Sequence, residues 1–280
     1  MKRKGTMNRN GQIVLAAFLC LLFNSGMAAE PAQGYPARPI RIIVPQIPGG
    51  TADTVARTMA PGLSAALGQQ LVIDNRGGAG GIIGTELAAR ALPDGYTISL
   101  NGAGPMTVLP NFQKQVPYDP IKDFDFAALL GRGPVMIVAG PSLAVNSLKE
   151  LIAVGKSKPN FITIASAGGF NHFVSAMLRS HAGFEATIAL YKGGGPALID
   201  VMGGHVHLAA PTIVTAAPHL RTGKLRALAI SNPRRLAVLP DVPTTAELGM
   251  PNMRFTNWLG VYAPAGTPAE IVERLIRILK

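Results

Sequence analysis

The chain has 280 residues, 48% of them hydrophobic and 15% charged, so it can build a sizeable core and is not expected to be disordered throughout. Aromatic residues make up only 6%, which disfavours a nucleic-acid surface built on base stacking. The formal net charge is +11, from 26 basic and 15 acidic residues. Beyond the first residues no run of lysine or arginine exceeds two, and a diffuse positive charge suits either an anionic ligand or simple solubility.

The first 28 residues have the order of a secretory signal peptide. A basic start is followed by the apolar stretch Ile13–Phe23 and by small residues at Gly26-Met27-Ala28. The apolar stretch is shorter than the ~20 residues that span a bilayer, so an uncleaved membrane anchor is the less favoured alternative. We therefore expect export to the periplasm with a mature N-terminus near Ala29. Because Cys20 would leave with the signal, the mature protein would contain no cysteine.

Strands and helices alternate along the rest of the chain, which indicates βαβ units and mostly parallel sheets. In the first part, the expected elements are strand 40–44, helix 52–67, strand 71–74, helix 82–92 and strand 96–100. In the middle, they are helix 148–156, strand 161–165, helix 172–182, strand 186–191, helix 197–202 and strands 206–210 and 225–230.

One sheet could hold all of these strands, but two long extended runs, 129–140 and 255–263, suggest that the chain passes twice between two lobes. We therefore predict an α/β fold in which residues 35–134 and 256–280 form the first lobe and residues 135–255 form the second. Ligands of open α/β sheets bind beyond the carboxyl ends of the strands, so a cleft is expected between the two sheets.

Four glycine-rich turns each follow a predicted strand and precede a predicted helix: 46–51, 101–104, 166–171 and 192–196. The backbone N–H groups at such a helix start can hold a carboxylate. The alternative at each turn is a well-capped helix without a ligand, with Thr51 as a good N-cap, and Lys192 is either a ligand contact or a solvated lysine. Together the four turns predict an anion clamp made of backbone amides.

Patterns for catalysis, metals and nucleotides are weak. Residues 78–84 are glycine-rich like a dinucleotide fingerprint, but residues 75–77 separate them from the preceding strand. The pair His205 and His207 has no cysteine or nearby carboxylate to complete a metal site. No Gly-x-Ser-x-Gly motif gives Ser166 the context of a nucleophile. We expect no catalytic residues, no metal, no cofactor and no nucleic-acid partner.

Short motifs along nearly the whole chain follow the order of a known family. They include Tyr35-Pro36-Ala37-Arg38-Pro39, Pro48-Gly49-Gly50, Pro93-Asp94-Gly95-Tyr96-Thr97, Tyr191-Lys192-Gly193 and Ala263-Pro264-Ala265-Gly266-Thr267-Pro268. In this combination the sequence resembles the substrate-binding proteins of the tripartite tricarboxylate transporters, the TctC or Bug-type receptors.

The resemblance implies a periplasmic Venus-flytrap receptor that captures a small organic carboxylate and delivers it to the membrane components of a tripartite tricarboxylate transporter. It leaves open a role in signalling to a sensor kinase, and an exported α/β hydrolase-like enzyme is the alternative from another class. The family's ligand loops, carried over to this sequence, give the candidate ligand-binding residues Gln46, Gly49, Gly50, Thr51, Asn101, Ala103, Ser166, Gly168, Asn171, Lys192 and Gly195.

Three departures from the family pattern stand out. Phe170 occupies a position that is usually small, and Gln46 and Ile47 replace residues that are commonly aromatic and small. The sequence ends at Lys280 inside a predicted helix where relatives continue, so the resemblance implies a truncated first lobe. The residues do not identify the carboxylate.

Overall fold

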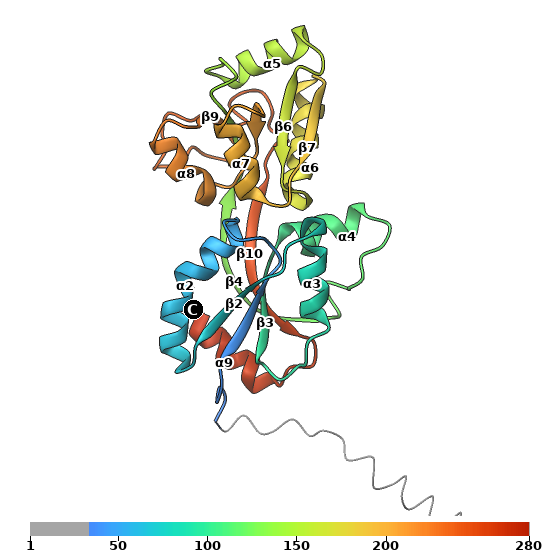
Figure 1. Cartoon of the computed structure of the whole chain (residues 1–280), viewed down its shortest axis with the longest axis vertical. Helices are drawn as coiled ribbons and strands as arrows, with labels where there is room; N and C mark the ends of the chain where they lie inside the picture. Colours follow the sequence, from blue (N-terminus) through green and yellow to red (C-terminus); the bar gives the residue numbers. More distant parts are fainter. Residues whose placement is uncertain (1–33, 280) are drawn as a thin grey trace, which may run out of the picture. The chain divides into compact units, whose positions relative to one another are not determined.

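The computed structural model describes residues 34–279, and the expected signal peptide of residues 1–28 lies outside this range. Two five-stranded sheets organise the described residues into two lobes (Figure 1). The strand order is β2-β1-β3-β10-β4 in the first sheet and β7-β6-β8-β5-β9 in the second. Within the described range, none of the helices is both long enough and apolar enough to cross a membrane.

The elements of the first lobe come from both ends of the described chain. Its strands are β1 (Ile40–Val44), β2 (Leu71–Asn75), β3 (Thr97–Gly102), β4 (Phe124–Pro134) and β10 (Thr256–Pro264). Its helical segments are α2 (Thr51–Leu67), η1 (Ala79–Gly81), α3 (Ile82–Ala89), η2 (Gly104–Val108), α4 (Leu109–Phe112) and α9 (Ala269–Leu279).

Helices cover both faces of the first sheet, and this explains why the apolar residues Ile42–Val44 of its inner strand β1 are buried in succession. From β1 the chain crosses through α2 to β2, and from β2 it returns over β1 through α3 to β3. Because such crossovers are right-handed, the two opposite directions put α2 and α3 on opposite faces, as Figure 1 shows. Successive residues Ile42 and Ile43 point to opposite faces, and both are buried.

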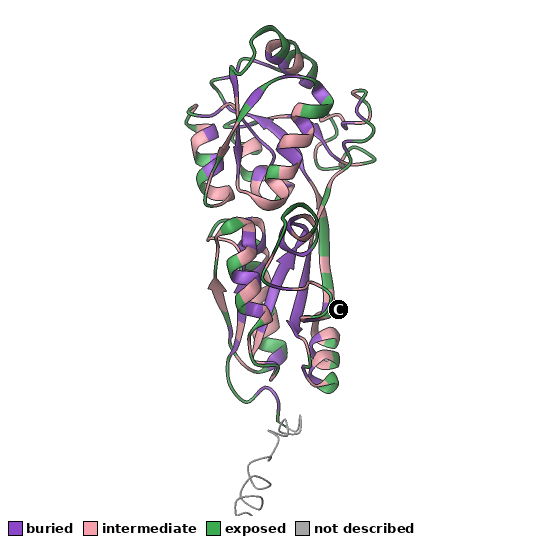
Figure 2. Ribbon diagram, turned by 90° about the vertical axis from the view of Figure 1, so that its right-hand side faces the viewer, coloured by how far each residue is buried: buried purple, intermediate pink, exposed green. Residues whose placement is uncertain are grey.

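The second lobe repeats this plan. Its strands are β5 (Met136–Ala139), β6 (Ile162–Ser166), β7 (Ala186–Leu190), β8 (Leu208–Ala209) and β9 (Arg226–Ile230). Its helices are α5 (Leu148–Ser157), α6 (Gly169–Ala182), α7 (Gly194–Met202) and α8 (Ile213–Arg221). Alternate residues of β5 contribute to two apolar clusters, with Ile137 in one and Met136 and Val138 in the other. The strands therefore form the buried layer of the lobe (Figure 2).

The two-lobed α/β fold predicted from the sequence is confirmed, but the expectation of mostly parallel sheets needs correction. In each sheet two of the four strand pairings are parallel and two are antiparallel. Each antiparallel pairing includes either β5 or β10, the strands next to the two passages between the lobes. These strands lie within or next to the extended runs from which the two passages were predicted.

Element boundaries differ from the sequence prediction by a few residues. Helix α3 ends at Ala89 instead of residue 92, and α6 begins at Gly169 instead of residue 172. Strand β8 is confined to Leu208–Ala209, because the N–H groups of His205 and Val206 turn back to the carbonyl of Asp200 at the end of α7.

Ser231 joins the two passages between the lobes. Its Oγ accepts a hydrogen bond from the N–H of Val135 (3.0 Å) and donates one to the carbonyl of Phe255 (2.6 Å). Its own N–H donates to the carbonyl of Val135 (2.8 Å). One buried side chain thus fixes both crossing segments to each other. The lobe boundaries predicted at 134/135 and 255/256 fall at these segments and stay a prediction.

Candidate functional site

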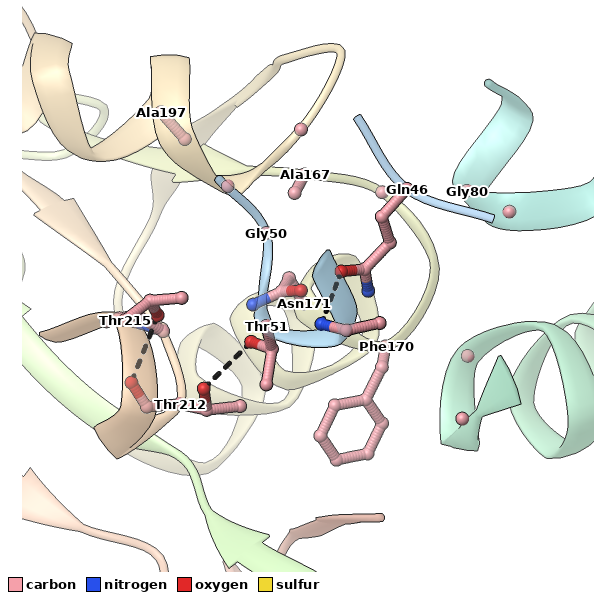
Figure 3. A pocket seen from close by; sticks show the side chains of 18 of the residues that line it. Gln46, Gly50, Thr51, Gly80, Ala167, Phe170, Asn171, Ala197, Thr212 and Thr215 are labelled. Atoms are coloured by element: carbon pink, nitrogen blue, oxygen red, sulfur yellow. Dashed lines mark hydrogen bonds between the residues drawn. The ribbon is translucent and has the colours of Figure 1, made fainter. Parts of the chain in front are cut away.

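Loops at the carboxyl ends of strands from both lobes line a cavity of about 90 Å³ (Figure 3). Each sheet begins with the strand order second-first-third, and in such sheets the crevice for a ligand lies between the first and third strands. Here these strands are β1 and β3 in the first lobe and β6 and β8 in the second. The loops after all four contribute to the cavity lining, so the two crevices face each other.

The wall from the first lobe is stabilised by its own side chains. Gln46 Oε1 accepts a hydrogen bond from the N–H of Ala52 (3.0 Å), and the carboxylate of Asp53 accepts one from the N–H of Gly49 (2.9 Å). Burial raises the pKa of Asp53, but hydrogen bonds from Arg57 and Gly49 outweigh burial and hold this pKa below its usual value. Asp53 is therefore ionised, and two amides near the start of α2 are already satisfied within the chain.

The wall from the second lobe leaves a helix start without a side-chain cap. Helix α7 follows Gly193 directly, and its first turn has no side-chain hydrogen bond. Gly193, Gly194 and Lys192 all line the cavity. Among the described residues of the lining, Lys192 is the only charged one. The positive end of the helix dipole and the lysine together favour an anion on this side of the cavity.

Hydrogen bonds hold the loop that carries Lys192. The hydroxyl of Tyr191 donates to Asp200 Oδ2 (2.7 Å), and the N–H of Tyr191 donates to the carbonyl of Ser166 (2.8 Å). Burial, followed by the contact with the Asp200 carboxylate, raises the pKa of Tyr191 to about 12, so its hydroxyl stays protonated at neutral pH and can donate. The backbone of Lys192 is thereby fixed next to the cavity.

The loops of the two lobes are in contact around the cavity. Thr51 Oγ1 and Thr212 Oγ1 are 2.9 Å apart and share a hydrogen bond (Figure 3). A Cβ atom added to Gly80 would lie 2.9 Å from the backbone nitrogen of Gly169, so these two backbones meet with no room for a side chain. The rings of Phe112 and Phe173 pack with centroids 5.3 Å apart. The structure is therefore a closed form of the cleft.

Six of the eleven residues predicted for the site line the cavity: Gln46, Gly50, Thr51, Gly168, Asn171 and Lys192. The other five, Gly49, Asn101, Ala103, Ser166 and Gly195, are not among its lining residues. Asn101 is fully buried, where its side chain accepts from Thr85 and donates to Ser99. Ser166 Oγ accepts a hydrogen bond from the N–H of Gly168 (3.2 Å) and so stabilises the turn between β6 and α6. A direct role of these eleven residues in binding stays a prediction.

Several lining residues lie outside the four turns predicted from the sequence. Thr212 lies in the turn between β8 and α8, and Thr215 lies in the first turn of α8. This connection has the same strand-to-helix plan as the predicted glycine-rich turns but lacks glycine. Gly80 belongs to the glycine run that was weighed only as a nucleotide fingerprint. Neighbours on β10 differ in role, because Asn257 lines the cavity whereas Trp258 packs against an apolar cluster.

Comparison with known proteins assigns the chain to a family. The model of a family described as "Tripartite tricarboxylate transporter family receptor" matches residues 55–280. The chain belongs to this receptor family. Its members are solute-binding receptors and not enzymes, so the hydrolase alternative is set aside. Within residues 34–279, no group of three or more histidine, cysteine, aspartate or glutamate side chains could hold a metal ion.

Relatives of this receptor cover most of its length. It is 38% identical over 268 residues to Protein BugT of Bordetella pertussis, covering 94% of this chain and 82% of BugT. The structure of MatC from Rhodopseudomonas palustris with bound malate matches with 34% identity and a TM-score of 0.84, covering 88% of this chain and 84% of MatC. An R. palustris protein with adipate matches with 33% identity and a TM-score of 0.85, covering 88% of this chain and 83% of that one.

Proposed function

We propose that this receptor captures a small organic carboxylate in the cleft between its lobes and delivers it to the membrane components of a tripartite tricarboxylate transporter. The observation that carries the proposal is the cavity between the two facing crevices, with Lys192 as its only charged lining residue among those described. The malate and adipate held by two relatives support a carboxylate as the ligand.

The residues suggest how the carboxylate is held. Lys192 and the start of α7 supply positive charge on the second lobe. Gln46, Thr51 and Asn171 are polar lining residues that can orient the ligand. We place the carboxylate on the second lobe, because two amides of the first-lobe turn are already paired with Gln46 and Asp53. Closure of the cleft then surrounds the ligand, and opening releases it.

The family assignment also supports where the receptor works. A receptor of this family receives its ligand outside the cytoplasm, so we propose that residues 1–28 direct export to the periplasm. The comparisons give no support for a sensor kinase as a partner, and we do not propose that role.

A thermal-shift screen tests the proposed function. The full chain is heated with malate, adipate, glutamate and benzoate, each compared with the amide in which every carboxylate has been replaced. A carboxylate present at 100 times its Kd raises the free energy of unfolding by ~2.7 kcal/mol. We expect at least one carboxylate to raise the melting temperature and its amide to have no effect. A screen in which no carboxylate stabilises the chain would overturn the proposal.

Lys192 provides a sharper test of the site. Lys192→Ala is expected to weaken binding of the stabilising carboxylate at least tenfold, or ~1.4 kcal/mol, if the lysine contacts the ligand. Lys224→Ala is the matched control, because Lys224 is also exposed but is not among the residues that line the cavity. Equal affinities of the two variants would show that Lys192 is only a solvated lysine.

A further inference from the structure

A second and larger cavity adjoins the cleft. This groove has a volume of about 900 Å³ and shares six lining residues with the cleft: Ile47, Gly78, Gly80, Ala167, Gly168 and Lys192. Like the cleft, it is bounded by both lobes, with α4 on one side and α6 and the end of β7 on the other. A ligand seated in the cleft therefore has a neighbouring space into which it can extend.

The groove is apolar. Its side chains include Val108, Leu109 and Phe112 from the first lobe and Phe173, Met177 and Leu190 from the second. Phe112 and Leu190 are each 70% exposed, so two large apolar side chains stand open on opposite sides of the groove. Uncovered apolar surface of this kind marks a place where a ligand or partner binds.

The charge and size of the two cavities restrict what fits. Lys192 is the only charged side chain among the described residues lining either cavity, and it belongs to both. One carboxylate can pair with it, but a second carboxylate reaching into the groove would find no other lysine or arginine among the described residues, only the imidazole of His172. The cleft, at about 90 Å³, is much smaller than the groove, at about 900 Å³, so the charged end of a ligand fits the cleft and its larger part fits the groove.

We infer that the ligand is an amphipathic monocarboxylate, with its carboxylate in the cleft near Lys192 and an alkyl or aromatic arm in the groove. This inference rests on the proposed function and adds the substrate class. Continuity between the cleft and the groove, together with the lysine at their junction, favours one ligand that occupies both. A dicarboxylate is disfavoured, because its second carboxylate would lie against apolar side chains, with no lysine or arginine other than Lys192 among the described residues of the groove.

Isothermal titration of the full chain with butanoate, hexanoate, octanoate and adipate tests the inference. Each methylene that enters the groove should raise the affinity about fourfold. Adipate has the same number of carbons as hexanoate and should bind at least roughly tenfold more weakly, because of its second charge.

Two variants locate the arm. Ala176→Phe fills the groove from α6, and Leu190→Asn makes its exposed edge polar. Both should reduce the gain in affinity from butanoate to octanoate. Ile199→Asn is the matched control, since Ile199 is similarly exposed, at 63%, but is not among the groove residues, and it should leave the gain unchanged. If Ala176→Phe fails to fold, Leu190→Asn still tests whether the arm lies in the groove, because a substitution at an exposed position is tolerated by the fold.

The outcomes separate this inference from the proposed function. An affinity that rises with chain length and loses that rise in Leu190→Asn supports the amphipathic ligand. Binding of adipate with no gain from butanoate to octanoate overturns the inference and leaves the proposed function standing. The affinity could also rise with chain length equally in wild type, Leu190→Asn and Ala176→Phe. That result would place the arm outside the groove and overturn the inference. A chain that binds none of these acids, nor any other carboxylate in the thermal-shift panel, overturns both.

Discussion

Closure of the cleft depends on a missing side chain at Gly193. A Cβ atom at this position would lie 2.3 Å from Cγ1 and 2.6 Å from Cδ1 of Ile47, which belongs to the other lobe. The backbone of Gly193 is extended (φ 174°), a conformation that alanine adopts freely. Gly193→Ala therefore adds a clash with Ile47 in the closed form without straining its own backbone.

The size of the effect follows from the geometry. Overpacking by one methyl group costs ~1–3 kcal/mol where the neighbours are held in place. In an open form the lobes separate and the clash disappears, so the cost falls on the closed form alone. Because the apparent affinity falls with the population of the binding-competent form, we expect binding to weaken roughly 5- to 150-fold.

A double-mutant cycle tests this reasoning. Isothermal titration with the most stabilising carboxylate is performed on Gly193→Ala, on Ile47→Ala and on the double variant. Ile47→Ala removes both atoms that clash, so the double variant should bind at least fivefold more tightly than the two single losses predict by addition. Strict additivity would refute the claim that Gly193 and Ile47 meet when the cleft closes.

Three further predictions concern stability and pH. Ser231→Ala should lower the free energy of unfolding by ~1–3 kcal/mol in urea denaturation, because it leaves the N–H of Val135 unpaired in the core; an unchanged midpoint would contradict the role of Ser231. Ser147→Ala should cost ~1 kcal/mol, because Ser147 Oγ accepts the N–H of Glu150 (3.1 Å) at the start of α5, and a melting temperature equal to wild type would count against this cap. Burial lowers the pKa of His207, whose Nδ1 accepts the N–H of Thr163 (3.1 Å). Its stabilisation is therefore complete above the unfolded pKa of ~6.5 and is lost as the pH falls toward the lower folded value. His207→Gln should flatten the loss of stability between pH 7.5 and 5, and an identical slope in both proteins would show that His207 is not responsible.

The sequence was sufficient to place most strands and helices. Strand β1 (Ile40–Val44) is apolar and β-branched apart from Arg41, and a glycine-rich turn follows it, so both the strand and its ligand-side loop were recognisable. The antiparallel direction of β10 could not be predicted from the sequence, because a strand's direction depends on the path of the chain between the lobes and not on the strand's own residues.

The details of the site depended on contacts that sequence cannot show. Asn101 was expected in a turn after residue 100, but β3 continues to Gly102, and Thr85 and Ser99 hold the Asn101 side chain inside the lobe. Ile47 and Gly193 are far apart in the sequence and meet only because the two crevices face each other. The use of Gln46 to satisfy the amide of Ala52 is a consequence of a local turn whose geometry no motif encodes.

The central claim is that the cleft holds one organic carboxylate and leaves it chemically unchanged. Isothermal titration of the full chain with the most stabilising carboxylate, followed by recovery of the ligand, tests this claim most directly. We predict one saturable site per chain and a recovered ligand identical to the one added. The absence of saturable binding by every carboxylate tested, or the conversion of the bound acid into a product, would contradict the account.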